Sequence, residues 1–357
     1  MFVSIKYFRN KVFHFLKIVS IILLLHLLPA CDISEEDYNQ VLIDSTTVYL
    51  VNVENNSITK IIDGENPMFI PYTNKILYRS IDKIYTLDMI SKDTKYIADM
   101  PGATVRLYTR LSLSKNGQYV SYTARGSNHT FDLFVASLIT GGNINLTKSA
   151  NSNESEGIFY HNDSRLLFSE SFFTPSGDFD SSGSSTISLF GDNYSFLTRN
   201  KYPIGFSVND RYCILIYYWD SSSSRGTIIY TYDMDLNKIV DSLLLDQQRI
   251  FVGPSLSDDM KLYYSSNENN YYKLDLLTKQ IDLLWTGKTS TNYKFSPDFK
   301  KVLVNHLNYV ELINLETSQT KIYFSNESYK VFFGEPCFSE DSKSFLITRY
   351  YHDEYYN

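Results

Sequence analysis

The chain is poor in the residues on which several protein classes depend. Its 357 residues include only three cysteines and six alanines, but 30 tyrosines and 23 phenylalanines. Three cysteines cannot form the disulfide framework of a small secreted fold. Alanine is the strongest helix former, whereas tyrosine and phenylalanine suit the pleated, half-buried surface of a strand. The composition therefore predicts an all-β protein.

Basic charge and catalytic signatures are scarce as well. The 33 Lys and Arg residues are outnumbered by 40 Asp and Glu residues, which gives a net charge of −7 and disfavours a nucleic-acid partner. The sequence contains no G-x-S-x-G, G-x-x-x-x-G-K, C-x-x-C or H-E-x-x-H motif. We therefore expect no cofactor, no metal and no assigned catalytic residue, and the sequence favours a non-enzymatic role.

The N-terminus has the features of an address signal. Residues 1–17 include four bases and no acid, and Ile18–Ala30 is a largely apolar run of thirteen residues. This run is too short to span a bilayer and has the length of a secretory h-region. It ends in Leu28-Pro29-Ala30-Cys31, which resembles a bacterial lipobox. We interpret residues 1–30 as a lipoprotein signal peptide and Cys31 as the lipid attachment site.

An acidic segment follows the expected lipid site. Asp32-Ile33-Ser34-Glu35-Glu36-Asp37 resembles the surface-export signal of Bacteroidetes lipoproteins, although charge runs are often plain solvated linkers. We assign residues 31–46 to an acidic tether and residues 47–357 to one folded domain. The expected location is the bacterial cell envelope, with the lipid in the outer membrane and the domain in the periplasm or on the cell surface.

The remaining chain is built from repeats. An apolar anchor followed by turn residues and a strand recurs about every 45 residues, which is the period of a four-stranded propeller blade. Ser, Asp, Asn and Gly cluster after each anchor because they form tight turns. The seven anchors begin at Phe69, Leu113, Phe159, Phe206, Leu256, Phe295 and Phe338.

A second mark gives the same number of units. Each unit contains a strand that ends apolar–polar–apolar, as in Leu87-Asp88-Met89 and Leu274-Asp275-Leu276, and a short outer strand follows. The first such pair, at Val48–Val53 and Ile58–Ile62, precedes every anchor, and the last anchor has no pair after it. We therefore predict a seven-bladed β-propeller, with six blades as the alternative. Its closing blade combines these N-terminal strands with C-terminal strands near Cys337–Phe338 and Ser344–Tyr350.

The repeats resemble those of a known family. Phe295-Ser296-Pro297-Asp298 and Phe131-Asp132-Leu133-Phe134-Val135-Ala136 are similar to the turn and strand of the WD40-like repeats in the TolB C-terminal propeller. The resemblance covers roughly residues 47–357 and implies a propeller fold. It operates at the level of single repeats, so it implies little about function.

The variable connections predict a binding face. We name the strands of a blade a to d from the axis outward, so that the b–c and d–a connections share one face. Long b–c connections are expected at residues 125–129, 169–185 and 219–225, and binding residues concentrate in such loops. The candidate ligand-binding residues are Arg125, His129, Phe172, Phe173, Asp178, Phe179, Asp180, Trp219, Asp220 and Arg225. Aromatic rings beside acids and hydroxyls suit a sugar or a peptide, although the rings could equally cover loop cores.

Two weaker patterns concern the channel and metals. Residues three positions before an anchor should lie at the channel mouth, and the polar ones are Asn66, Arg110, Glu156, Asn292 and Glu335. The stretch Asp178–Gly183 resembles the start of a calcium loop, but Leu189 stands where the bidentate acid belongs. Histidines fall at b–c connections (His129, His306 and His352) and in one a–b turn (His161), without ligand spacing.

Three functions remain open on the sequence alone. The first is a non-catalytic, lipid-anchored envelope propeller that binds a protein or glycan on its b–c face. The second is a propeller-type polysaccharide lyase or another carbohydrate-active enzyme. The third is a structural subunit of an outer-membrane complex.

Overall fold

The computed structural model describes residues 45–100, 111–126, 130–220, 225–246, 250, 254–266, 270–287, 292–306, 308–325 and 331–351. The chain divides into two compact units, residues 1–42 and 43–357, and all described residues belong to the second. The described elements of this unit are strands only. No helix among the described residues is both long enough and apolar enough to cross a membrane.

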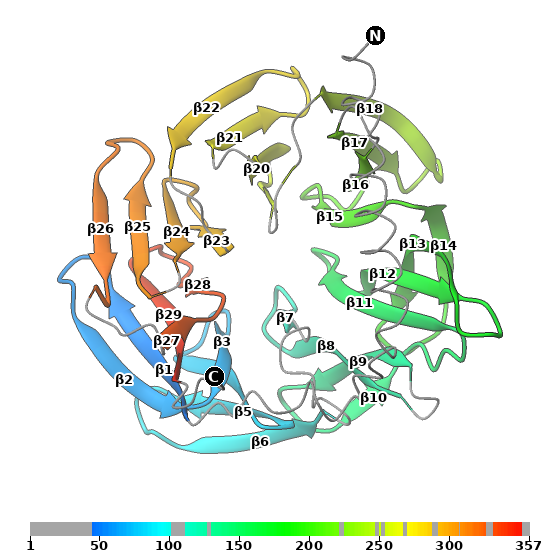
Figure 1. The fold of residues 1–357 in the computed structure, drawn as a ribbon. Coiled ribbons are helices and arrows are strands. Elements are labelled where there is room, and N and C mark those ends of the chain that lie inside the picture. The colour runs from blue at the N-terminus through cyan, green and yellow to red at the C-terminus, as the bar shows by residue number, and fades with distance from the viewer. Residues whose placement is uncertain are drawn as a thin grey trace, which may run out of the picture. The chain divides into compact units, whose positions relative to one another are not determined.

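Seven antiparallel sheets are arranged around a central axis, as Figure 1 shows in a view along that axis. Blade 1 consists of β3 (Glu65–Phe69), β4 (Lys75–Ser80), β5 (Lys83–Asp88) and β6 (Thr94–Asp99). Blade 2 consists of β7 (Ser112–Leu113), β8 (Tyr119–Arg125), β9 (Phe131–Ser137) and β10 (Asn143–Asn145). Blade 3 consists of β11 (Ser152–Phe159), β12 (Arg165–Phe173), β13 (Phe179–Ser188) and β14 (Ser195–Arg199). Within each of these blades the strands pair in sequence order.

The next three blades repeat this order. Blade 4 consists of β15 (Tyr202–Phe206), β16 (Tyr212–Asp220), β17 (Arg225–Asp233) and β18 (Lys238–Asp246). Blade 5 consists of β19 (Ser255–Leu256), β20 (Lys261–Ser265), β21 (Asn270–Asp275) and β22 (Ile281–Thr286). Blade 6 consists of β23 (Asn292–Phe295), β24 (Lys301–Asn305), β25 (Val310–Asn314) and β26 (Thr320–Tyr323).

Blade 7 closes the ring with both ends of the domain. It pairs β2 (Ile58–Asp63), β1 (Ser45–Asn52) and β29 (Ser344–Tyr351), and β29 also pairs with β27 (Val331–Phe333) and β28 (Cys337–Phe338). The β1–β29 register is continuous from Ser45 opposite Tyr351 to Asn52 opposite Ser344. The predicted seven-blade closure is therefore confirmed, and the six-blade alternative is wrong. The tail 353–357, which is rich in tyrosine and could add a further strand to this blade, lies outside the described residues.

The serine in most a–b turns has a defined structural role. In five blades its hydroxyl donates a hydrogen bond of 2.6 to 2.8 Å to the Asn or Asp two residues later, as from Ser114 to Asn116 and from Ser296 to Asp298. The same oxygen accepts a backbone N–H from the start of the next strand. These bonds satisfy the turn backbone locally, which explains why serine recurs after the apolar anchor.

The apolar–polar–apolar mark is explained by the c–d turns. The polar residue is the last of strand c. In the five blades where it is Asp or Asn, its side chain accepts two backbone N–H groups of the turn, and in blades 2 and 3 a serine accepts one. Asp88 accepts those of Ile90 and Ser91, and Asn314 those of Glu316 and Thr317. Such Asx turns fix the chain reversal without a tertiary partner.

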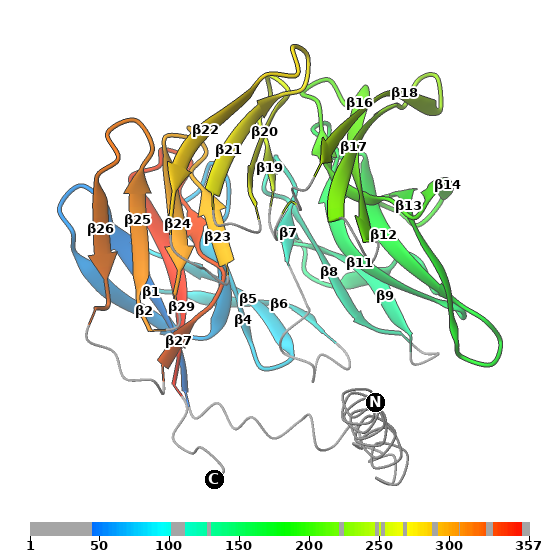
Figure 2. The same ribbon diagram turned by 45° about the horizontal axis from the view of Figure 1, so that its top comes forward.

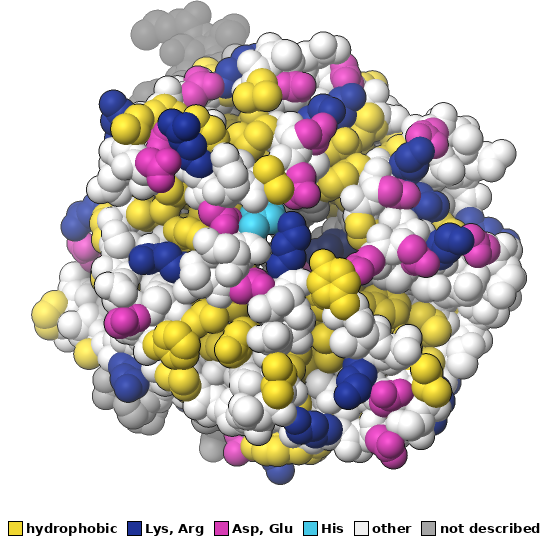
Figure 3. All heavy atoms as spheres, turned by 180° about the vertical axis from the view of Figure 1, so that it is seen from behind, with side chains coloured by type: hydrophobic (Ala, Val, Ile, Leu, Met, Phe, Trp, Pro, Cys, Tyr) yellow, Lys and Arg dark blue, Asp and Glu magenta, His cyan; other side chains and the backbone are white. Residues whose placement is uncertain are grey.

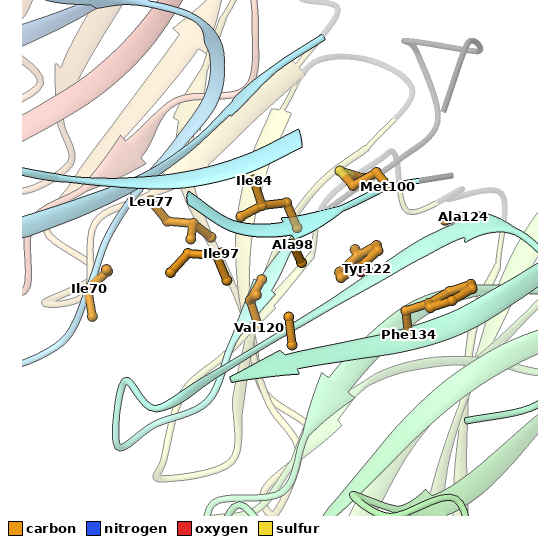
Figure 4. Close-up of a cluster of buried hydrophobic side chains, with 11 residues drawn as sticks. Ile70, Leu77, Ile84, Ile97, Ala98, Met100, Val120, Tyr122, Ala124 and Phe134 are labelled. Carbon is orange, nitrogen blue, oxygen red and sulfur yellow. The ribbon is translucent and has the colours of Figure 1, made fainter. Parts of the chain in front are cut away.

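Apolar side chains fill the spaces between neighbouring blades. Figure 4 shows the cluster between blades 1 and 2, where Ile84 and Ile97 from blade 1 lie near Val120 and Phe134 from blade 2. The turns connect blades as well, because the buried carboxylate of Asp163 accepts the N–H groups of Lys115 and Asn116 in the preceding blade. Each blade is thus held by its two neighbours.

Candidate functional site

On the b–c face, β12 and β13 of blade 3 form an extended hairpin, similar in strand length to β16 and β17 of blade 4. Figure 2 shows this hairpin projecting beyond the neighbouring blades. Its turn is short, because β12 ends at Phe173 and β13 begins at Phe179. The expected long connection over residues 169–185 is therefore wrong. Strand pairing continues to the tip, and the serines of this segment therefore satisfy their backbone in the ladder instead of in turns.

The three phenylalanines of the hairpin form aromatic pairs. Phe173 meets Phe179 edge to face at 6.3 Å between ring centroids, and Phe172 meets Phe196 of β14 at 5.9 Å. Phe172 and Phe173 are half-buried, whereas 62% of Phe179 remains exposed. Phe172 and Phe173 thus stiffen the hairpin, and Phe179 presents an aromatic surface to solvent.

The acids of the hairpin tip are exposed and are held by short local bonds. The Ser176 hydroxyl donates to Asp178 at 2.7 Å, and the Ser181 hydroxyl donates to Asp180 at 2.9 Å. Most of the stretch that resembles a calcium loop lies in β13, and the described residues contain no group of acids, histidines or cysteines arranged to hold a metal ion.

The other predicted b–c residues lie on blades 2 and 4. Arg125 is the last residue of β8, and its guanidinium carbon lies 5.9 Å from the centroid of the Phe131 ring. Trp219 and Asp220 end β16, and Arg225 begins β17, with Asp220 opposite Arg225 in the register. The side chains of these three residues, and His129 as a whole, lie outside the described part of the structure.

Two of the five predicted channel-mouth side chains are described. Asn66 follows the start of β3, and its backbone N–H donates to the Thr348 hydroxyl of blade 7 at 3.2 Å. Exposed Glu335 forms an ion pair with Lys294 of blade 6, with 3.3 Å between Nζ and Oε1. Both residues therefore connect neighbouring blades. Arg110 and the side chains of Glu156 and Asn292 lie outside the described part.

The structure also reveals a buried acidic cluster between blades 2 and 3 that the sequence did not indicate. Asp132 of β9 and Glu154 of β11 are 1% and 2% exposed, and the Ser149 hydroxyl lies 3.1 Å from a carboxylate oxygen of each. Thr147 and Ser152 also donate to Glu154, at 2.8 and 2.6 Å. Hydroxyl donors thus surround Glu154, whereas Asp132 also accepts the side-chain amide of Asn145 and the backbone N–H of Ser149.

A third acid lies directly across the sheet from Glu154. Glu170 of β12 is opposite Glu154 in the register, is also buried, and accepts hydrogen bonds from Ser185 and Tyr194. The pKa of Glu154 is raised to about 7, chiefly by burial; the hydroxyl donors oppose this shift, and the negative charge of Asp132 adds to it. Glu154 is therefore partly protonated near neutral pH.

A faint sequence signal for this cluster exists in the alternation of β12. Leu166, Phe168 and Glu170 are alternate residues of one strand and therefore point to one face. Because Glu170 continues the alternation of two apolar core residues, the pattern indicates that its carboxyl group is buried. Its partners Asp132 and Glu154 come from other strands, and only the fold brings them together.

The described histidines lie on opposite faces, as expected, and each has an acidic neighbour. His161, in the a–b turn of blade 3, lies 3.0 Å from Asp210 and 3.5 Å from Asp258. His306, at the b–c end of blade 6, lies 3.2 Å from Glu311 and stacks on Tyr309. His352 lies outside the described residues.

Comparison with known proteins supports the fold and leaves the chemistry open. No protein-family model and no curated protein matches the chain. Among solved structures, an oligogalacturonate lyase in complex with manganese is 12% identical, with a TM-score of 0.62, and the match covers 87% of this chain and 97% of that one. An oligogalacturonate lyase from Vibrio parahaemolyticus is 10% identical, with a TM-score of 0.62 and coverage of 88% and 98%.

A TolB structure also matches. The putative TolB from Agrobacterium tumefaciens is 12% identical, with a TM-score of 0.46, and the match covers 86% of this chain and 98% of that one. At these identities the likenesses to the lyases show the propeller fold alone. The relation to TolB repeats rests on the turn and strand motifs of the sequence.

Proposed function

We propose that this chain is a non-catalytic binding module of the bacterial envelope, anchored by lipid at Cys31, which binds a protein or glycan ligand on its b–c face. The observation that carries the binding role is the projecting β12–β13 hairpin, with exposed Phe179 between the exposed acids Asp178 and Asp180. A rigid aromatic residue beside carboxylates suits stacking on a sugar ring or anchoring a peptide. The b–c ends of blades 2 and 4, with Arg125 and Trp219, complete the proposed face.

For the enzymatic alternative, the pKa of one buried acid is favourable, but the burial of all three acids is not. A carboxyl group with a pKa of about 7, as in Glu154, is suited to proton transfer. However, Glu154, Glu170 and Asp132 are all nearly inaccessible to solvent. A general acid or base must touch the reacting group, so a binding role fits this geometry better than a lyase.

Replacing Phe179 by Ala is expected to weaken ligand binding. A screen of envelope glycans and peptides on the full chain would identify a ligand, and titrations would then compare Phe179→Ala with Phe190→Ala. Phe190 is the matched control, because it is an exposed phenylalanine of the same blade at the opposite face. Loss of a stacking ring is expected to lower the affinity roughly 10-fold. Equal affinity of both variants and the parent would place the ligand elsewhere.

Replacing Cys31 by Ala is expected to leave an unprocessed precursor without bound acyl groups. In the lipobox interpretation the lipid is attached to the thiol of Cys31, and the variant has no thiol at this position. Mass spectrometry of the purified chain and acyl labelling in cells would measure the outcome. Normal cleavage and normal localisation of Cys31→Ala would contradict the anchor.

A further inference from the structure

The c–d turns of five consecutive blades each expose one apolar side chain. Their exposed fractions range from 55% for Leu236 to 76% for Phe190. We call these residues the apolar ring; its members are Ile90, Ile139, Phe190, Leu236 and Leu277, from blades 1 to 5. Exposed Tyr72 and Val208 lie in a–b turns, which open on the same face. Four of the five ring residues stand at the same position of the turn, and Leu236 of blade 4 stands one residue later. Isolated exposed apolar residues are ordinary, but their recurrence in the same turn of successive blades is not.

The turns themselves do not require apolar residues. In blades 4, 6 and 7 the position of Ile90 holds an acid (Asp235, Glu316 and Glu54). The N–H of each acid donates to the last residue of strand c, as the N–H of Ile90 donates to Asp88. The same Asx turn therefore forms with a charged residue. The apolar residues thus occupy solvent-exposed positions at which polar residues would be more favourable, which indicates that this surface contacts a partner.

The ring has a geometry that suits a flat partner. The apolar ring residues occupy the same turn in successive blades of a closed ring, so they lie near one plane at the edge of the face. Each is separated from the next by a whole blade, so no single pocket could hold them. Figure 3 shows this face, with hydrophobic side chains spread among Lys, Arg, Asp and Glu.

We propose that the apolar ring contacts a lipid bilayer and that the c–d turns of blades 1 to 5 insert into the interfacial region of this bilayer. A bilayer accepts separate apolar tips in one plane without complementary pockets, and apolar side chains bury well at the boundary between headgroups and acyl chains. Because the face carries both charge signs, this contact is expected to depend little on anionic lipid. Glu54 and Glu316 mark the side at which the face leaves the bilayer.

The expected anchor is compatible with this orientation. β1 belongs to blade 7 and begins at Ser45 on the b–c face, opposite to the apolar ring. The thirteen residues from Asp32 to Asp44 can span up to about 45 Å, whereas the eight-residue strand β1 is about 27 Å long. A lipid at Cys31 can therefore reach the bilayer on which the ring rests. In this respect the inference rests on the proposed envelope location.

The test places a fluorescent label at one position of the full chain. Phe190→Cys carries the label on the ring, and Phe179→Cys carries it at the opposite face of the same blade. The native thiols of Cys213 and Cys337 are expected to react slowly, since burial raises the pKa of both, and Cys31 can react only if it is not acylated. Labelling of the parent chain measures this background. Each chain is mixed with vesicles of phosphatidylethanolamine and phosphatidylglycerol that contain spin-labelled quencher lipids.

We expect quencher lipids to remove most of the fluorescence at position 190 and little at position 179. A label at Ile139→Cys should also be quenched, and Ile90→Glu with Leu277→Glu should abolish that quenching without changing the melting temperature. Quenching only at position 179, or at neither position, would overturn the proposal. A stable complex of the ring with a protein, without vesicle contact, would overturn it in favour of a protein partner.

This outcome is separable from the proposed function. The mass of the purified chain reports whether Cys31 is acylated, and quenching at position 190 is measured on the same sample. An unacylated chain that is still quenched contradicts the anchor alone. Ligand affinity of Phe179→Ala is measured without vesicles, so its result does not depend on the ring.

Discussion

A chain that ends at Lys343 is expected to lose the cooperative unfolding of the propeller. The deletion removes β29, which pairs with β1 on one side and with β27 and β28 on the other. Phe345, Leu346 and Ile347 of this strand are fully buried. Burial of each such side chain contributes about 1.5–3 kcal/mol, so the loss of three approaches the whole stability of a typical domain, about 5–15 kcal/mol.

Calorimetry and urea unfolding would measure this effect. A chain that ends at Tyr351 is the matched control, because it keeps β29 and loses only the last six residues. This control should unfold as the parent does. Since each blade is held by its neighbours, the longer deletion should also destabilise blades 1 and 6. If the chain that ends at Lys343 melted at the parent temperature with equal cooperativity, the closure by blade 7 would be refuted.

Replacing Glu154 by Gln is expected to stabilise the protein at and above neutral pH. The pKa of this carboxyl group rises from 4.5 in the unfolded chain to about 7 in the folded one. Between these values the folded state binds the proton and the unfolded state does not, so this group makes stability fall as pH increases. The full effect is about 3 kcal/mol, reached above pH 7 and absent below pH 4.5.

The measurement compares urea unfolding of the parent and Glu154→Gln from pH 4 to 8. The difference in unfolding free energy should be small at pH 4 and should grow through the window up to pH 7. Exposed Glu340→Gln serves as a control and should follow the parent throughout. If the parent and Glu154→Gln gave parallel profiles, the proton on Glu154 would not be linked to folding.

The fold was largely predictable because its signals are local. The Ser-x-Asp turn and the Asx turn at the end of strand c satisfy their own backbone within a few residues, so they recur at a readable period. The offset between the first outer pair and the last anchor predicted the closing blade, and the structure pairs β1 with β29 as expected.

The candidate site was less predictable. The residues 169–185 suggest a flexible loop by composition, since serine, glycine and aspartate favour turns. In the fold they extend a hairpin instead, because Ser169, Ser171 and Ser181 lie in β12 and β13, where the ladder satisfies their backbone. Composition does not distinguish a serine in a turn from a serine in a buried strand.

The all-β class, the number of blades and the closure of the ring follow from the sequence, since each depends on contacts between residues close in the chain or on counting repeats. Which side chains meet across blades follows only from the packing of the folded chain. Asp132 and Glu154 lie on different blades, and their shared donor Ser149 lies in the connection between them. The apolar ring likewise became visible only when five turns, each ordinary alone, lay on one face. Burial and surface exposure depend on how blades pack together, and no single repeat contains that information.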